Sequence, residues 1–145
     1  MTAADVVSFF PAWTGEHGAA LIAATPLMGA AIAAVTPSGR GAWAITFATT
    51  VFCALIAGVL LALSWTQGVV SYDLGGWAPP LGIEYRIDPL NGAIMLLVSV
   101  MGALCAFYAP ASVAAEIPPR KHALFYATFL VCFAGLLGVA ATGDA

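Results

Sequence analysis

The side chains that could carry a charge or a proton are few, and they stand outside the long apolar stretches of the sequence. The 145 residues include seven Asp and Glu, four Lys and Arg, and two His. A path for protons or cations through hydrocarbon normally needs a buried side chain of one of these kinds. The apolar stretches 18–35, 42–65 and 90–108 contain none, and 122–141 has only His122, at its first position. The sequence therefore predicts that these stretches alone carry no charge across a membrane.

The two histidines and the hydroxyls do not form a recognisable catalytic set. We expect His17 and His122 on opposite faces of a membrane, where they cannot share a metal ion, with His17 solvated and His122 part of a basic anchor beside Arg120 and Lys121. Hydroxyls within apolar helices usually bond back to their own backbone. The sequence thus predicts no catalytic, cofactor-binding or metal-binding residue and no enzyme activity. The hydroxyls concerned are those of Thr25, Thr46, Thr49, Thr50, Ser99 and Thr128.

The cysteines and the last carboxylate have structural interpretations. Cys53, Cys105 and Cys132 each stand in the middle of an apolar run, their number is odd, and no CxxC motif occurs. We interpret them as small core residues rather than as metal ligands or a disulfide framework. Asp144 follows the last apolar stretch and is interpreted as a solvated helix end.

The composition determines the broad class of the protein. Hydrophobic residues make up 62% of the chain and charged residues only 8%, whereas a soluble domain has about 25% charged residues. So few charged side chains cannot cover a surface that faces water. The sequence therefore predicts an all-α integral membrane protein that lies in a lipid bilayer, and the lack of a basic patch argues against nucleic acid as a partner.

Four apolar stretches predict four transmembrane helices within a domain at 18–145. The first, 18–35, would rise about 27 Å as a helix, close to the hydrocarbon thickness of about 30 Å. The shorter apolar patch within 1–17 cannot span a bilayer, so we expect an interfacial segment there. The predicted spans are 18–35, 42–65, 90–108 and 122–141.

Prolines and tryptophans refine these spans. Pro26 should kink the first span, because proline lacks the N–H that its helix needs, and packed neighbours should satisfy the freed carbonyl. Pro110 is expected to end the third span. Trp43 and Trp65 bracket the second span, and we expect them in the two headgroup layers.

The longest polar insert, 69–88, predicts a β-hairpin on the membrane surface. Apolar and polar residues alternate along 83–88, the pattern of a strand with one buried face. Gly75-Gly76 and Pro79-Pro80 favour a turn before it. An irregular polar loop is the alternative.

Three charged residues near the end of this insert have expected partners. Asp88 followed by Pro89 is typical of a helix N-cap with proline in the first turn. Arg86 and Glu84 could form an ion pair across the hairpin, although an exposed pair contributes little to stability.

The basic residues suggest an orientation. Four spans place both termini and the hairpin on one side of the membrane, which then has Arg86 alone, whereas Arg40, Arg120 and Lys121 fall on the other side. Basic residues concentrate on the cytoplasmic side of membrane proteins. We therefore expect a multi-pass protein of the bacterial inner membrane, with the hairpin and both termini in the periplasm.

The insert also resembles a known sequence motif. Residues 74–94, LGGWAPPLGIEYRIDPLNGAI, resemble the LGxWxxPxGIxxxxDxL stretch of antiporter-like membrane subunits, namely the D subunit of Mrp-type Na⁺/H⁺ antiporters and the proton-pumping N subunit of bacterial respiratory complex I. The Pro26-containing helix and the terminal Thr142-Gly143-Asp144 are similar to this family too, and the latter favours the Mrp-type protein. The matching residues are Leu74, Gly75, Trp77, Pro80, Gly82, Ile83, Asp88 and Leu90.

The resemblance implies a role within a larger assembly. Family members have further helices, and their functional glutamate and lysines lie on those helices, without counterparts in this chain. We therefore expect a non-catalytic N-terminal four-helix section of an antiporter-like subunit, with other membrane subunits as partners. The assembly would translocate Na⁺ or H⁺, as an Mrp-type antiporter or a NADH-quinone oxidoreductase. A structural or assembly subunit without a transport role and a self-sufficient four-helix dimeric transporter are the alternatives.

Overall fold

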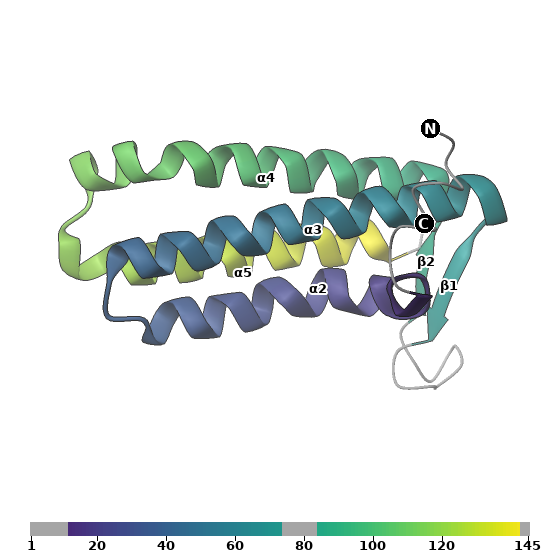
Figure 1. Ribbon diagram of the computed structural model, residues 1–145, viewed down its shortest axis with the longest axis horizontal. Helices are drawn as coiled ribbons and strands as arrows, with labels where there is room; N and C mark the ends of the chain where they lie inside the picture. The colour runs from purple at the N-terminus through teal and green to yellow at the C-terminus, as the bar shows by residue number, and fades with distance from the viewer. Residues whose placement is uncertain (1–11, 74–83, 143–145) are drawn as a thin grey trace.

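The computed structural model describes residues 12–73 and 84–142 of the chain. The described residues form an up-and-down bundle of four long helices with a small two-stranded sheet at one end (Figure 1). A single 3-10 turn, η2, precedes the last helix. The elements are α2 (Ala12–Val35), α3 (Gly39–Gln67), β1 (Val70–Asp73), β2 (Glu84–Ile87), α4 (Pro89–Glu116), η2 (Pro119–Lys121) and α5 (His122–Ala141).

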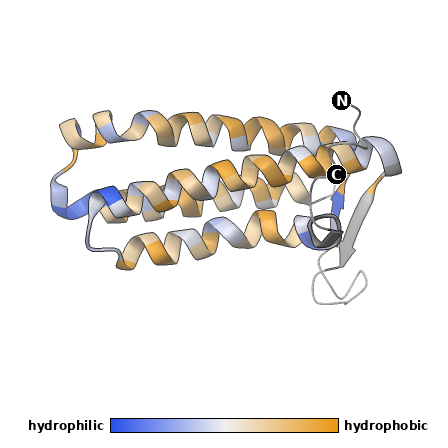
Figure 2. Cartoon of the chain, viewed as in Figure 1, coloured by the Kyte–Doolittle hydropathy of each residue, from blue (hydrophilic) through white to orange (hydrophobic). Residues whose placement is uncertain are grey.

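Four helices in the described part of the chain are long and apolar enough to cross a membrane. The qualifying segments have 19, 28, 28 and 23 residues. The most hydrophilic residues gather toward the two ends of the bundle (Figure 2). Large apolar side chains such as Val35, Phe107 and Val139 are exposed on the outside of the bundle. Such a surface suits lipid rather than water. The predicted class, a mainly helical multi-pass membrane protein, is therefore confirmed.

Each predicted span lies within one helix; α3 is slightly longer than its span, and α2 and α4 extend well beyond theirs. Helix α2 begins at Ala12, so the part of the predicted interfacial segment 1–17 that the structure describes is helix continuous with the first span. Residues 1–11 lie outside the described part. Helix α4 continues through Pro110 to Glu116, and the prediction that this proline ends the helix is wrong.

The two short connections lie at one end of the bundle, which we call the turn end. Residues 36–38 join α2 to α3 there, and 117–121 join α4 to α5. The strands, the start of α2 and the end of α5 lie at the opposite end, which we call the strand end (Figure 1). Helix α3 packs against both α2 and α4, so it has neighbours on two sides. Helix α2 also packs against α5.

The strands β1 and β2 pair antiparallel. Val70 is the partner of Ile87, and Ser71 the partner of Arg86. Ile87 is fully buried and Arg86 is exposed, as the alternation along 83–88 predicts. The structure supports these two paired strands but not a complete periplasmic hairpin over 69–88, because 74–83 lie outside the described residues and no membrane side is defined.

The strand register corrects the predicted ion pair. Arg86 and Glu84 both belong to β2, and the register places them opposite Ser71 and Asp73. An ion pair across the sheet between Arg86 and Glu84 is therefore wrong.

Candidate functional site

The acidic, basic and histidine side chains of the described helices lie at or near helix ends. Arg40 is the second residue of α3, Glu116 is the last of α4, and His122 is the first of α5. His17 and His122 lie at opposite ends of the bundle, as predicted, and His17 is exposed. Within the described residues, no three His, Cys, Asp or Glu side chains are placed to hold a metal ion. The absence of catalytic, cofactor and metal residues stays a prediction.

Most hydroxyls inside the helices donate hydrogen bonds to backbone carbonyls of their own helix. Two of the six hydroxyls named above, those of Thr49 and Ser99, make no such bond, and the Ser99 Oγ is fully buried without a hydrogen-bond partner among the described residues. A buried hydroxyl left unpaired costs about 1–3 kcal/mol. The predicted backbone bonds are confirmed for Thr25 to Leu21, Thr46 to Ala42, Thr50 to Phe47 and Thr128 to Leu124.

Pro26 leaves one carbonyl of α2 without a helical partner, and α3 supplies a donor for it. Proline has no N–H, so the carbonyl of Ile22, four residues earlier, loses its normal bond. The Cys53 Sγ of α3 lies 3.9 Å from this oxygen, within reach of a weak S–H donor. Cys53 is fully buried, as predicted for a small core residue, and the expectation that a packed neighbour serves the freed carbonyl is confirmed.

Pro110 creates the same gap in α4, and α3 again fills it. The freed carbonyl is that of Ala106, and the Trp43 Nε1 donates to it at 2.9 Å. This bond explains why α4 continues past Pro110, since the backbone group that the proline leaves unpaired is satisfied by a neighbouring helix. Trp43 therefore lies half-buried between helices, whereas Trp65 is 74% exposed. The placement of both tryptophans in headgroup layers stays a prediction.

The other two cysteines lie on the outside of the bundle. Cys105 and Cys132 are free thiols and exposed, so their predicted position in the core is wrong. A central position in an apolar run predicts depth in the bilayer. It does not select the face of the helix when residues on every face are apolar.

At the strand end, side chains and backbone fasten the sheet to the helices. The Asp88 carboxylate accepts a hydrogen bond from the Asn91 backbone N–H at 2.7 Å, which confirms the predicted N-cap. The Asn91 Nδ2 donates to the carbonyl of Arg86 at 3.0 Å. Tyr85 forms a backbone bridge with Thr142, directly after α5. Strand β2 is therefore linked to both α4 and α5. Asp144 lies outside the described residues.

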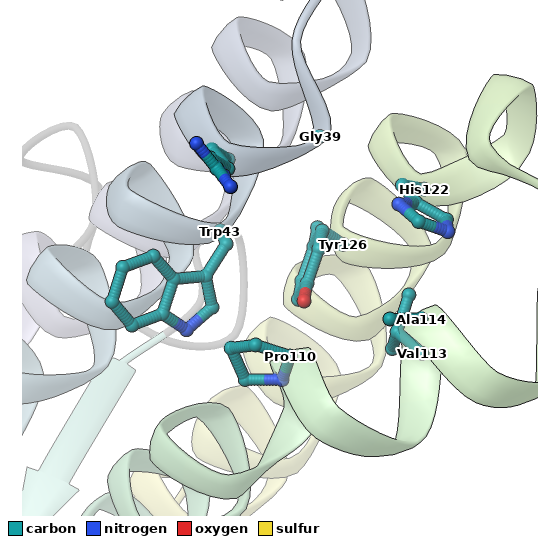
Figure 3. Close-up of a pocket in the computed structure, with 8 residues that line it drawn as sticks. Gly39, Trp43, Pro110, Val113, Ala114, His122 and Tyr126 are labelled. Atoms are coloured by element: carbon teal, nitrogen blue, oxygen red, sulfur yellow. The ribbon is translucent and has the colours of Figure 1, made fainter.

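At the turn end, a cavity of about 320 Å³ lies between α3, α4 and α5. Trp43, Tyr126 and His122 face it from α3 and α5, and Pro110 faces it from α4 (Figure 3). The cavity has cationic, aromatic and apolar lining residues. The full lining is Gly39, Arg40, Trp43, Pro110, Val113, Ala114, His122 and Tyr126.

His122 is held in place at the edge of this cavity. Its Nε2 lies 2.8 Å from the carbonyl oxygen of Ile117, so the ring bridges the connection between α4 and α5. A Cβ atom at Gly39 would lie 2.9 Å from the ring, so only glycine fits there without a shift. His122 is therefore packed against the connection between α4 and α5. Its role as part of a basic anchor beside Arg120 and Lys121 stays a prediction.

Comparison with known proteins finds three informative relatives, whereas no family model matches the chain. The chain is 47% identical over 73 residues to the N subunit of a NADH-quinone oxidoreductase of Desulforudis audaxviator, which covers 50% of this chain and 14% of the relative. It is 30% identical over 90 residues to the D subunit of a Na(+)/H(+) antiporter of Bacillus subtilis, covering 62% of this chain and 18% of the relative. It is 34% identical over 124 residues to the A/B subunit of a probable K(+)/H(+) antiporter of Rhizobium meliloti, covering 82% of this chain and 12% of the relative.

These relatives confirm the resemblance that the motif at 74–94 suggested. The matched region is less than a fifth of each relative, with shares of 14%, 18% and 12%. Each relative therefore contains a large part that has no counterpart in this sequence. The chain is similar to one section of the antiporter-like membrane subunits, the proteins that include the N subunit of NADH-quinone oxidoreductase and the D subunit of Na(+)/H(+) antiporters.

Proposed function

We propose that the chain forms the N-terminal, non-catalytic four-helix section of an antiporter-like subunit. It works in a multisubunit membrane complex that translocates cations or protons, and it contributes packing and subunit contacts. The ionisable residues that move charge belong to other membrane segments of the complex. The observation that carries this proposal is the combination of similarity to these subunits with predicted spans whose interiors are free of Asp, Glu, Lys, Arg and His.

The bundle suits such a supporting role. Most polar groups inside the bundle are engaged locally, since most of the hydroxyls bond to their own helices and the Trp43 and Cys53 donors bond to carbonyls freed by proline. Exposed apolar residues on α4, such as Leu97, Leu104 and Phe107, leave a broad outer surface for lipid or neighbouring subunits. A section of this kind can add stability and contacts without providing a path for ions.

The orientation belongs to the same proposal. Arg40, Arg120 and Lys121 lie at the turn end, and we place this end at the cytoplasmic face of a bacterial inner membrane because basic residues favour that side. The strand end and both termini then face the periplasm.

The self-sufficient dimeric transporter is the weaker alternative. A small exchanger of protons needs an ionisable group at mid-membrane, and the predicted spans supply none there. A structural or assembly subunit without any link to transport remains a distinct candidate, because the same helices would serve it equally well.

Co-purification separates the proposal from the alternative of an assembly subunit. The chain, tagged and produced at native levels in its source membrane, would be extracted in a mild detergent and its companions identified by mass spectrometry. We expect a stoichiometric membrane subunit with Glu and Lys inside its own spans. An unrelated four-helix membrane protein with the same tag is the control. Recovery of the folded chain with no such subunit would contradict the proposal.

A further inference from the structure

Positive charge gathers around the cavity at the turn end. Arg40, Arg120 and Lys121 are all exposed at this end of the bundle, and Arg40 lines the cavity. Glu116 is the one carboxylate that the described residues place at this end, and it does not line the cavity. The charge balance around the cavity therefore favours an anion.

Backbone groups add to this preference. Gly39 and Arg40 begin α3, so the cavity lies at the N-terminus of this helix. Helix α5 continues directly from η2, and the His122 N–H donates to the Pro119 carbonyl. The first N–H groups of a helix have no intrahelical partner, and the helix dipole is positive there. Ser38 caps the N–H of Gly41 at 2.9 Å. The N-terminus of α3 is a helix end of the kind that suits a phosphate group.

The rest of the lining is apolar and aromatic. Trp43, Pro110, Val113 and Tyr126 form the part of the cavity nearer the middle of the bundle (Figure 3). Tryptophan and tyrosine are enriched where membrane proteins meet the headgroup layer. A small inorganic anion would leave this apolar wall unused, whereas a lipid places its glycerol and the start of its acyl chains against such a surface.

A second cavity, of about 230 Å³, lies between α4 and α5. Val113 and Tyr126 line both cavities, and the second extends along the helices to Cys105 and Phe129. Its lining is almost entirely apolar and aromatic, so it suits an acyl chain rather than a headgroup. The polarity of the two cavities thus changes from the turn end inward, as it does along a phospholipid.

We propose that the turn-end cavity binds the headgroup of an anionic phospholipid. The phosphate lies near Arg40 and the N-terminus of α3, and the glycerol region lies against Trp43 and Tyr126. A volume of about 320 Å³ is at the lower end of the range for ligand pockets, about 300–1,000 Å³, so it holds a headgroup and not a whole lipid. Basic pockets between transmembrane helices bind anionic headgroups in this way.

Lipid titration of the purified chain tests the proposal. Phosphatidylglycerol and phosphatidylcholine with identical acyl chains would be added to the chain in detergent, and binding would be measured by native mass spectrometry. We expect preferential binding of phosphatidylglycerol. Arg40→Gln should weaken this binding about five- to tenfold, whereas Arg120→Gln should leave it nearly unchanged, because Arg120 does not line the cavity.

Three results would overturn the proposal. The first is an absence of preference for phosphatidylglycerol over phosphatidylcholine. The second is an equal loss of phosphatidylglycerol binding in Arg40→Gln and Arg120→Gln, which would indicate general electrostatic attraction to the basic end of the bundle. The third is equally tight binding of inorganic phosphate, which would indicate an ion site instead of a lipid site. Circular dichroism of both variants verifies that the helices are retained.

Discussion

At the scale of single residues, Trp43 and Cys53 each place a donor beside a carbonyl that a proline leaves unpaired. Both donors come from α3, and the two acceptors lie in different helices, the Ala106 carbonyl in α4 and the Ile22 carbonyl in α2. An unpaired backbone carbonyl is costly in hydrocarbon, because no water can replace the missing bond. These two contacts explain how prolines are accommodated inside spans that otherwise form regular helices.

The Trp43 bond has a direct test in a pair of substitutions. Trp43→Phe should destabilise the bundle by about 1–2 kcal/mol, because the Ala106 carbonyl loses its donor. In a Pro110→Ala background the cost should be clearly smaller, since alanine restores a backbone N–H for that carbonyl. Unfolding in mixed detergent micelles measures each difference.

A matched control accompanies this cycle. Trp65→Phe removes the same indole N–H from a residue that is 74% exposed, and it should change stability little. An equal loss of stability on Trp43→Phe in the native and Pro110→Ala backgrounds would show that ring packing, and not the hydrogen bond, accounts for the effect.

Residue roles that depend on one helix were predictable from the sequence, and roles that depend on a neighbouring helix were not. Asp88 followed by Pro89 identifies a cap because donor and acceptor lie three residues apart. Trp43 and its acceptor are 63 residues apart, so neither the bond nor the continuation of α4 past Pro110 follows from local patterns. The exposure of Cys105 was missed for the same reason, since the packed face of α4 is determined by its neighbours.

At the scale of elements, glycine positions determine how closely the helices approach. A Cβ atom at Gly92 would lie 3.1 Å from the Leu61 Cα of α3, and one at Gly102 would lie 2.5 Å from the Phe133 ring of α5. Helix α4 therefore meets α3 and α5 through positions where only a hydrogen atom fits. Small residues at helix contacts are a general means of packing in membranes, where van der Waals contact replaces the hydrophobic effect.

Gly102→Ala should reveal this contact. The added methyl group overlaps the buried Phe133 ring, so we expect a destabilisation of about 1–3 kcal/mol. Phe133→Leu should recover part of the loss by making room. Gly135→Ala on α5 is the matched control, because a Cβ atom there meets nothing within 4 Å, and it should be neutral or slightly stabilising. If both alanine variants have the stability of the native chain, the close contact between α4 and α5 at Gly102 is wrong.

The elements themselves were largely predictable. Length and apolar composition decide a transmembrane helix, so all four spans fall within helices of the structure. The alternation along 83–88 predicted which residues of β2 are buried. Register was not predictable from that alternation, since Arg86 lies opposite Ser71 and not opposite another charged residue.

At the scale of the whole molecule, the bundle has two chemically different ends. The turn end carries Arg40, Arg120 and Lys121 with the cavity, whereas the strand end carries the paired strands tied to α4 and α5. The proposed orientation places the turn end at the cytoplasmic face of the membrane.

Cysteine labelling tests this orientation. Pro37→Cys at the turn end and Thr66→Cys at the strand end place exposed thiols on opposite sides. A membrane-impermeant maleimide added to intact spheroplasts should label Thr66→Cys and not Pro37→Cys, which should react only after permeabilisation. The native chain is the control, because its three cysteines lie within the predicted spans, out of reach of an impermeant reagent. Labelling of Pro37→Cys from outside would reverse the orientation.

The most direct measurement of the central claim is ion flux through the chain alone. The chain would be reconstituted into liposomes, its insertion would be verified by the same labelling, and a pH or Na⁺ gradient would be imposed. A bundle whose predicted spans have no Asp, Glu, Lys, Arg or His in their interiors should give a flux equal to that of protein-free liposomes. A flux well above that background, rising with the amount of inserted chain, would contradict the account of the four helices as a non-conducting section of a larger complex.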